Sequence, residues 1–342
     1  MAHEIKKTDK FAEVRSAGKR AWHGLGIEIP EGLSAEDAFT KVGLGWRTEL
    51  APVYATVDVL SENGIATKRL ELPHQRAHVR MDTMEALGVV SDKYQKLENL
   101  DLARFADSLA GADAAINVET CGSLHDGRRI FACVKLPEVV RATADDVLEQ
   151  YVLVSNGHGG FASFSCYPTS VRVVCANMLR WSERDAARGL SFIHLGGSME
   201  ERQKMARHAL GIARAETAKF EEQVQALVRS NVSVANVRKM YLSIYDSCFG
   251  KIDGSATPET REKMEAKRAE VIELWVKNLD DERQKVKGIV GTKWAAYNAV
   301  SQWCDHERGF SEDSLVARVS SNLFGVSQKD KLTAFRRILA TV

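Results

Sequence analysis

The sequence predicts an α+β protein, in which an N-terminal antiparallel sheet with hairpins and packed helices is followed by a mainly α-helical C-terminal region. From Trp46 to about Leu179, short runs rich in Val, Ile, Thr and Tyr alternate with turn residues, as in a sheet. From Ser198 onward the pattern is long, charged and helical. We therefore divide the chain into an N-terminal arm (1–33), an α+β core domain (34–196) and a helical C-terminal domain (197–342).

The first elements are a short helix and a hairpin. Ser34-Ala35-Glu36-Asp37 resembles a capping box and predicts a helix start, and Gly43 and Gly45 predict its end. The following run, 48–60, alternates apolar and polar residues and returns through 66–72. Asn63-Gly64 between two alternating runs is a strong hairpin signal.

The rest of the core domain continues as strands around one helix. Asp126-Gly127 predicts the turn of a second hairpin between 117–124 and 128–135. We expect further strands at 76–81, 86–90, 150–156, 163–167 and 171–175, and a helix at 100–109. The C-terminal region is expected to form helices at 198–229, 258–287, 292–304, 311–323 and 329–340.

Composition limits the class of protein. The chain has 342 residues, with 47 Lys and Arg against 46 Asp and Glu, so any nucleic-acid contact must come from a local basic patch. No stretch is apolar enough for a membrane span or a secretory signal, and we expect a cytoplasmic protein. The six cysteines contain no C-x-x-C pair and are expected to be reduced, mostly buried thiols.

A glycine-rich loop is one candidate site. In the run from Asn156 to Gly160, three glycines surround His158, so that backbone at Gly159 can approach a ligand and the imidazole can bind phosphate or exchange a proton. The alternative is a hairpin loop whose glycines supply positive φ angles. No G-K-[ST] follows, so the loop is not a P-loop.

Arg172 is a second candidate, because it interrupts an apolar run that reads as a buried strand. A buried guanidinium needs a partner, which predicts either phosphate binding or an internal salt bridge. Cys175 in the same run is either a nucleophile or, more in keeping with its valine neighbours, a small core residue.

Other catalytic signals are weak. His74 and His78 lie in an extended segment, and no histidine, cysteine or carboxylate group has metal-ligand spacing. We expect no metal and no cofactor, and an enzyme is the weaker interpretation.

Basic residues near aromatic ones form the most informative pattern. Cations that follow phosphates and aromatic rings that stack on bases suit single-stranded nucleic acid, whereas the alternative is a solvated surface with anchoring aromatics. The candidate nucleic-acid-binding residues are Lys93, Tyr94, Lys96, Arg128, Arg129, Arg172, Arg180 and Trp181.

Several segments together resemble a family of uncharacterised phage- and plasmid-borne proteins built on a domain of unknown function. The segments that carry the resemblance are 21–26 (AWHGLG), 87–94 (LGVVSDKY), 121–124 (CGSL), 168–179 (PTSVRVVCANML) and 291–300 (GTKWAAYNAV). The resemblance implies a protein of mobile genetic elements that acts in the cytoplasm of a bacterial host. It implies no established reaction.

The segment 33–46, a short helix and a Gly-x-Gly-Trp turn before a hairpin, is similar to the entry to the core of single-strand annealing recombination proteins. This likeness implies a homo-oligomer that binds single-stranded DNA, or RNA, and anneals it without ATP. Two alternatives remain: an enzyme that acts on a phosphate-containing substrate through His158 and Arg172, and a counter-defence protein with an apolar patch on its C-terminal helices. The residues considered for that patch are Trp275, Trp294, Tyr297 and Trp303.

Overall fold

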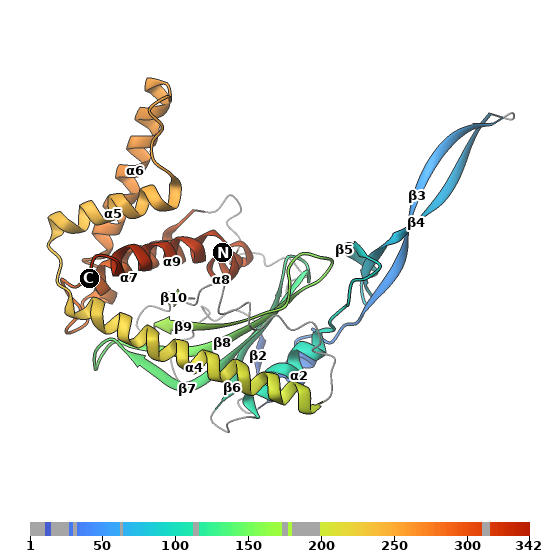
Figure 1. Cartoon of the computed structure of the whole chain (residues 1–342), viewed down its shortest axis with the longest axis horizontal. Helices are drawn as coiled ribbons and strands as arrows, with labels where there is room; N and C mark the ends of the chain where they lie inside the picture. The colour runs from blue at the N-terminus through green and yellow to red at the C-terminus, as the bar shows by residue number, and fades with distance from the viewer. Residues whose placement is uncertain are drawn as a thin grey trace.

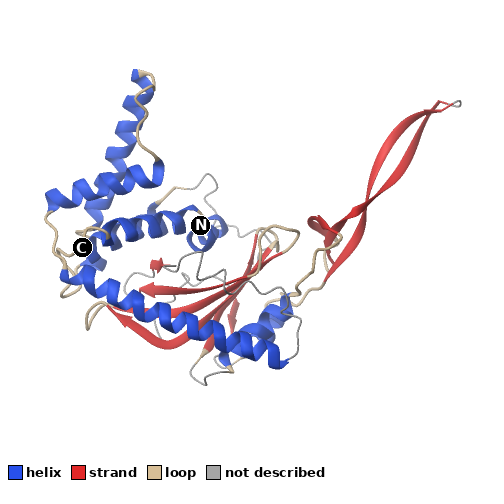
Figure 2. Ribbon diagram, in the orientation of Figure 1, coloured by secondary structure: helices blue, strands red, loops and turns tan. Residues whose placement is uncertain are grey.

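The computed structural model describes residues 11–14, 27–29, 33–61, 64–111, 116–172, 177–179, 199–309 and 315–342. It confirms the α+β class, with two sheets followed by a mainly helical region (Figures 1 and 2). The strands are β1 (Phe11–Val14), β2 (Ile27–Ile29), β3 (Thr48–Ser61), β4 (Gly64–Arg80), β5 (Glu85–Ser91), β6 (Asn117–Leu124), β7 (Arg129–Arg141), β8 (Val147–Gly157), β9 (Ser165–Arg172) and β10 (Asn177–Leu179). The helices are α1 (Ala35–Lys41), α2 (Asn99–Ala110), α4 (Met199–Arg229), α5 (Val234–Phe249), α6 (Pro258–Asn278), α7 (Lys293–Gln302), α8 (Leu315–Phe324) and α9 (Val326–Leu339), with a 3-10 turn η1 (Glu282–Gln284) and a π-helical turn η2 (Trp303–Glu307).

The larger sheet has the strand order β10-β9-β8-β7-β6-β1-β2. Adjacent strands of this sheet pair antiparallel, except for β1 and β2, which are parallel to each other. Both faces are covered. Ala132 and Val152 pack in a core with α1, α2 and the first half of α4, whereas Phe131 and Leu153 face α8. Burial on two faces explains why β7 and β8 are almost continuously apolar.

A second core lies at one end of this sheet, where β7 ends and β8 begins. It joins Val140 and Leu148 to the second half of α4 and to α5, α6, α7 and α9. Trp275 and Trp294 are fully buried there. The long helix α4 crosses the sheet and reaches the C-terminal helices (Figure 1), so it contributes side chains to both cores.

The smaller sheet consists of β3, β4 and β5, and most of it projects away from the rest of the molecule (Figure 1). We call residues 51–61 and 64–75, the projecting part of this β3–β4 hairpin, the arm. This segment is distinct from the N-terminal segment 1–33, and the word is used below for the hairpin alone. Its ladder ends with the pairs Leu60 with Ile65 and Ser61 with Gly64. The sequence predicted separate strands at 66–72 and 76–81, but β4 runs through both. Pro73 is tolerated because it lies in the irregularity between Glu71 and Arg76, where the ladder needs no N–H.

Local signals in the sequence are otherwise confirmed for most elements. The Ser34 hydroxyl caps α1 by accepting from the N–H of Asp37. Helix α5 was not predicted, although Ser233 caps its start and Gly250 follows its end. Helix α6 stops at Asn278, short of the predicted end at 287. The predicted domain boundary near Gly196-Gly197 lies outside the described residues.

Five cysteines fall in the described part of the chain. Cys121, Cys133, Cys166 and Cys304 are buried, Cys248 is half-buried, and all five are free thiols, whereas Cys175 lies outside the described residues. Burial raises the pKa of the Cys121 and Cys166 thiols to about 12. No helix in the described segments combines the length and the apolar character needed to cross a bilayer.

Candidate nucleic-acid interface

A tight turn and a glycine-rich loop meet at one end of the larger sheet. The turn joins β6 to β7, and His125, Asp126 and Gly127 all have positive φ. The loop follows β8, and Gly159 and Gly160 also have positive φ, as predicted. The N–H of His158 donates to the carbonyl oxygen of Arg128 at 2.8 Å, so turn and loop hold each other in place.

Basic and aromatic side chains gather on the outer side of this junction. The guanidinium of Arg128 lies 5.0 Å from the ring centre of Phe161, and that of Arg129 lies 5.4 Å from it. Arg129 also lies 4.0 Å from the ring of Phe324, and the imidazole of His125 lies 5.0 Å from Phe161. We call these five residues the Arg–Phe cluster. Arg128 and Phe161 are exposed, so the cluster offers cations and an aromatic surface to solvent.

His125 connects this cluster to α8. One ring nitrogen, Nε2, lies 2.8 Å from the hydroxyl of Ser320. Partial burial lowers the pKa of His125, and the neighbouring Arg129 and Arg128 lower it further. The imidazole is therefore mainly neutral near pH 7 and gains a proton more readily when an anion offsets the two guanidinium charges.

A second group of side chains is buried beneath the junction. Trp46, His78, Arg80, Asn99 and His158 form what we call the histidine cluster, and none of them is more than 7% exposed. The ring of His158 lies 5.1 Å from that of Trp46 and 5.2 Å from that of His78. The guanidinium of Arg80 covers Trp46 at 4.5 Å and forms an ion pair with Asp82 at 2.6 Å.

The hydrogen bonds assign the protons of both histidines. Gly159 N–H donates to Nδ1 of His78, which leaves the proton of a neutral His78 on Nε2. Asn99 donates its amide to the Leu44 carbonyl oxygen, so its own oxygen accepts from His158 Nε2 at 2.7 Å. Burial, together with His78 and Arg80, lowers the pKa of His158 to about 3. His158 is therefore a neutral, enclosed side chain and not an acid or base for a bound substrate.

The remaining candidates from the sequence lie in different environments. Lys93 is exposed in the turn after β5. Tyr94 is half-buried, packs on His78 and donates to the carbonyl oxygen of Gly157 at 3.4 Å. Lys96 donates to the Thr48 carbonyl oxygen and pairs with Glu98. Asn156 is buried next to Leu97. Arg180 and Trp181 lie outside the described residues.

Arg172 lies at the opposite end of the sheet from His158. It pairs with Leu148 at the start of β8, whereas His158 follows the end of that strand. Its guanidinium is 1% exposed and forms an ion pair of 2.6 Å with Asp146. Of the two roles predicted for Arg172, the geometry matches the internal salt bridge. Since His158 and Arg172 do not share a site, the geometry gives no support to an enzyme built on that pair.

The aromatic residues considered for a docking patch are part of the C-terminal core. The residues Trp275, Trp294, Tyr297 and Trp303 are between 0 and 7% exposed. In the described segments, no group of three or more His, Cys, Asp or Glu side chains is arranged so that it could bind a metal ion.

Sequence reasoning missed His125, Phe161 and Phe324 at the surface, and Trp46, Arg80 and Asn99 beneath it. His125 and Phe161 were within reach, because they flank the turn and the loop that the glycines indicate. Phe324 and Trp46 carried no local signal, since their neighbours in space come from distant parts of the sequence.

The fold and this junction define an α+β protein of two sheets with a helical C-terminal region and a basic, aromatic surface cluster. Residues 86–330 match the family described as "Domain of unknown function (DUF932)", and the chain belongs to this family. The match covers the Arg–Phe cluster and most of the C-terminal helices, whereas the arm precedes it. No curated protein and no solved structure matches the chain.

Proposed function

We propose that this protein binds single-stranded nucleic acid through the Arg–Phe cluster and self-associates, without catalysing a reaction. The observation that carries the proposal is the position of Phe161, which is 40% exposed and lies within 5.4 Å of two guanidinium groups. An exposed ring can stack on a base while the guanidinium groups contact the flanking phosphates.

The surroundings of the cluster favour a single strand over a duplex. The residues come from a turn, a loop and the end of a helix, and not from a helix positioned to enter a groove. Within the described part of the chain, Arg128 forms no ion pair, so its charge is available to a phosphate. Unpaired bases expose the faces that an aromatic ring recognises.

The net charge of +1 makes self-association part of the proposal. One cluster with two arginines contacts few phosphates, and each contact contributes modestly at physiological salt. Several linked copies on one strand increase the overall affinity because the later contacts are intramolecular. The mobile-element origin and an annealing activity, both implied by resemblance, fit such a protein and belong to the same proposal.

A salt-titrated anisotropy assay with a labelled oligonucleotide of mixed sequence tests the binding site. We expect Arg128→Ala to weaken binding and to reduce the slope of log K against log salt by about 0.7, the value for one phosphate contact on a single strand. Phe161→Ala should weaken binding by about 5-fold or more while the slope is retained, because stacking carries no counterion release.

Arg337→Ala is the matched control, since Arg337 is exposed on α9 and lies outside the cluster. It should leave the affinity within about twofold. Binding that does not depend on salt, no binding, or equal effects of Arg128→Ala and Arg337→Ala would contradict the proposal. Parallel titrations with DNA and RNA of the same sequence show which strand is preferred.

A further inference from the structure

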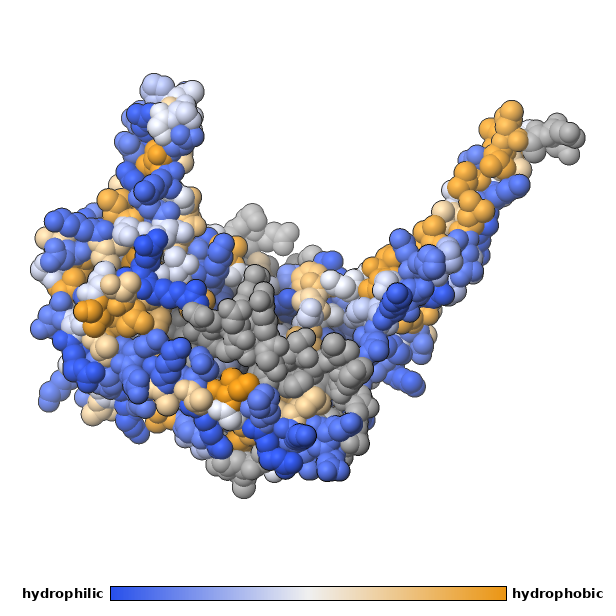
Figure 3. Space-filling model, viewed as in Figure 1, coloured by the Kyte–Doolittle hydropathy of each residue, from blue (hydrophilic) through white to orange (hydrophobic). Residues whose placement is uncertain are grey.

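The arm is a projecting segment without a cover. Within residues 51–60 and 64–75, none is buried. At the tip, Leu60 is 90% exposed and its cross-strand partner Ile65 is 75% exposed. Figure 3 shows apolar side chains along the described part of the arm. A two-stranded hairpin alone is marginally stable in water, and exposed apolar residues at such positions mark a contact surface.

The charge of the arm indicates what it contacts. Residues 51–75 carry three acidic side chains, Asp58, Glu62 and Glu71, and two basic ones, Lys68 and Arg69. Arg69 is engaged above the ring of Tyr54, and Asp58 accepts from the hydroxyl of Thr67. A ribbon with a small excess of acidic charge and with exposed apolar residues near its tip is unsuited to a polyanion and suits a protein surface.

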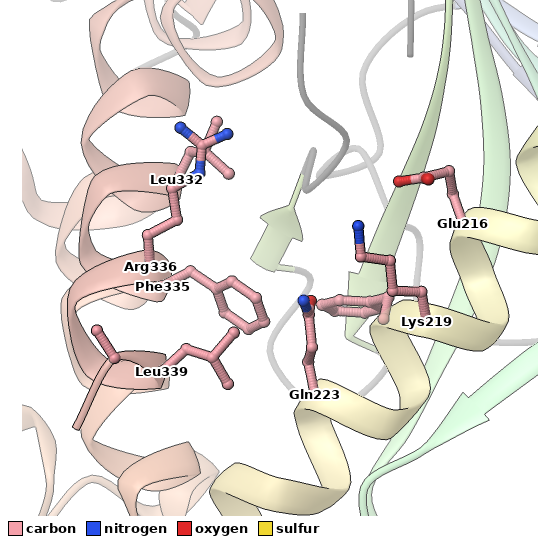
Figure 4. Close-up of a pocket in the computed structure, with 9 residues that line it drawn as sticks. Glu216, Lys219, Gln223, Leu332, Phe335, Arg336 and Leu339 are labelled. Carbon is pink, nitrogen blue, oxygen red and sulfur yellow. The ribbon is translucent and has the colours of Figure 1, made fainter. Parts of the chain in front are cut away.

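The chain also contains a recess that is lined by both apolar and charged side chains. A cavity of about 330 Å³ opens between α4 and α9 (Figure 4). The apolar part of its lining comes from Phe220 on α4 and from Leu332, Phe335 and Leu339 on α9. Phe220 and Phe335 are buried and contact each other, with their ring centres 5.6 Å apart. Polar side chains line the same recess, namely Glu216, Lys219 and Gln223 on α4 and Arg336 on α9.

Tip and recess are complementary in chemistry and are arranged for contact between copies. Leu60 and Ile65 can supply the apolar contact. Asp58 lies two residues from Leu60 on the same face of β3, so its carboxylate can pair with Lys219 or Arg336 of the recess once the tip is seated. In Figure 1 the arm points away from α9, toward the other end of the longest axis. An arm of about 35 Å that points away from its own recess can fill only that of another molecule.

From these features we infer that the tip of the arm, centred on Leu60 and Ile65, inserts into the α4–α9 recess of a second copy of this chain. The contact joins two different surfaces, so it is head-to-tail, and repeated contacts produce a ring or a filament. This inference rests on the self-association in the proposed function and assigns its interface. The Gly159 loop contacts His78 at the base of the arm, so the Arg–Phe cluster is held in a fixed position relative to the arm. Copies joined through their arms therefore present their clusters at regular intervals.

Paired variants of the full-length chain test the inference by sedimentation velocity without nucleic acid. The tip variant carries Leu60→Lys and Ile65→Lys, and the recess variant carries Leu332→Lys and Arg336→Glu. We expect the wild type to sediment as an oligomer and each variant alone as a monomer. An equimolar mixture should form a dimer and nothing larger, because one intact tip then meets one intact recess.

Val234→Lys is the matched control, since Val234 is 61% exposed on α5 and belongs neither to the arm nor to the lining of the recess. It should assemble as the wild type does. A monomeric wild type, an oligomeric tip variant or an oligomeric recess variant would each overturn the inference, and so would a mixture that stays monomeric. Oligonucleotide binding by the monomeric variants, measured in parallel, distinguishes failure of this interface from failure of the Arg–Phe cluster as a binding site.

Discussion

The backbone N–H of Gly159 donates a hydrogen bond of 3.0 Å to Nδ1 of His78, which joins the loop of the candidate nucleic-acid interface to the base of the arm. The contact requires a close approach of three chain segments. Gly88 lies opposite His78 in the β4–β5 ladder, and a Cβ on Gly88 would lie 2.3 Å from the carbonyl oxygen of Gly159. Because Gly88 has no side chain, the Gly159 loop beside the Arg–Phe cluster can pack directly against the base of the arm.

Gly88→Ala should destabilise the protein, because the neighbour that must move is backbone. Overpacking of this kind costs about 1–3 kcal/mol. Urea unfolding measures the loss. Gly211→Ala on α4 is the matched control, since nothing lies within 4 Å of its added Cβ. It should raise the free energy of unfolding by about 0.5–1 kcal/mol, as replacement of a glycine within a helix does. Similar effects of both substitutions would contradict the role of Gly88.

His158 should make the protein less stable in mild acid. Its pKa is about 3 in the folded protein, against an ordinary value of 6.5, so the unfolded chain binds a proton below pH 6.5 that the folded chain excludes. The stabilisation is complete above pH 6.5 and is lost progressively as the pH falls toward 3. Between pH 7 and pH 5 the free energy of unfolding should decrease by about 2 kcal/mol from this residue.

The variant His158→Gln isolates this contribution, because the glutamine amide can still donate to Asn99 and does not titrate. His78, whose pKa burial also lowers, remains in both proteins and contributes in the same direction. Urea unfolding at pH 7 and at pH 5 measures the free energy of unfolding of both proteins. This free energy should decrease more in the wild type than in His158→Gln when the pH is lowered from 7 to 5. Equal decreases in both proteins would show that His158 does not titrate on unfolding.

The ion pair between Arg172 and Asp146 should support stability and not binding. Asp146 accepts from Arg172 and from the indole N–H of Trp294 at 2.8 Å, and Arg172 donates to Gln284 at 3.0 Å. Asp146→Ala leaves a buried guanidinium without its carboxylate and should cost about 3–5 kcal/mol. Adding Arg172→Met should recover part of that loss in thermal unfolding. Reduced oligonucleotide affinity in a folded Arg172→Met protein would instead assign Arg172 to the binding site.

Oligonucleotide binding should strengthen as the pH falls from 7.5 to 5.5. The pKa of His125 is lowered in the free protein by burial and by two arginines, and a bound phosphate favours the protonated ring. Anisotropy titrations at constant salt measure the effect. His125→Gln should flatten the pH dependence while leaving the affinity at pH 7.5 nearly unchanged. A pH dependence that survives His125→Gln would place the responsible group elsewhere.

Local sequence signals predicted much of the fold. Asn63-Gly64 and Asp126-Gly127 indicated both hairpin turns, and Ser34 indicated the start of α1, because each signal acts within a few residues. The continuity of β4 through Pro73 was not predictable in this way, since it depends on an irregularity in the pairing with β3.

The candidate site was predicted less completely, for the same physical reason. Arg128 and the loop around His158 stood out from composition alone. The environment of His158, however, is set by Trp46, His78 and Asn99, which belong to three other elements. In the sequence His158 looks like a catalytic or binding residue, but in the fold it is buried and uncharged. Only the tertiary contacts show this difference.

The length of α4 has a consequence for how the molecule unfolds. Its 31 residues span about 46 Å, with one half in the sheet core and the other half among the C-terminal helices. Neither half of the chain can open without exposing apolar surface on this shared helix. The backbone amides of α4 should therefore exchange with solvent only when the whole chain unfolds in a single cooperative transition. A fragment ending before Met199 lacks the helix that covers the sheet core and should not fold stably.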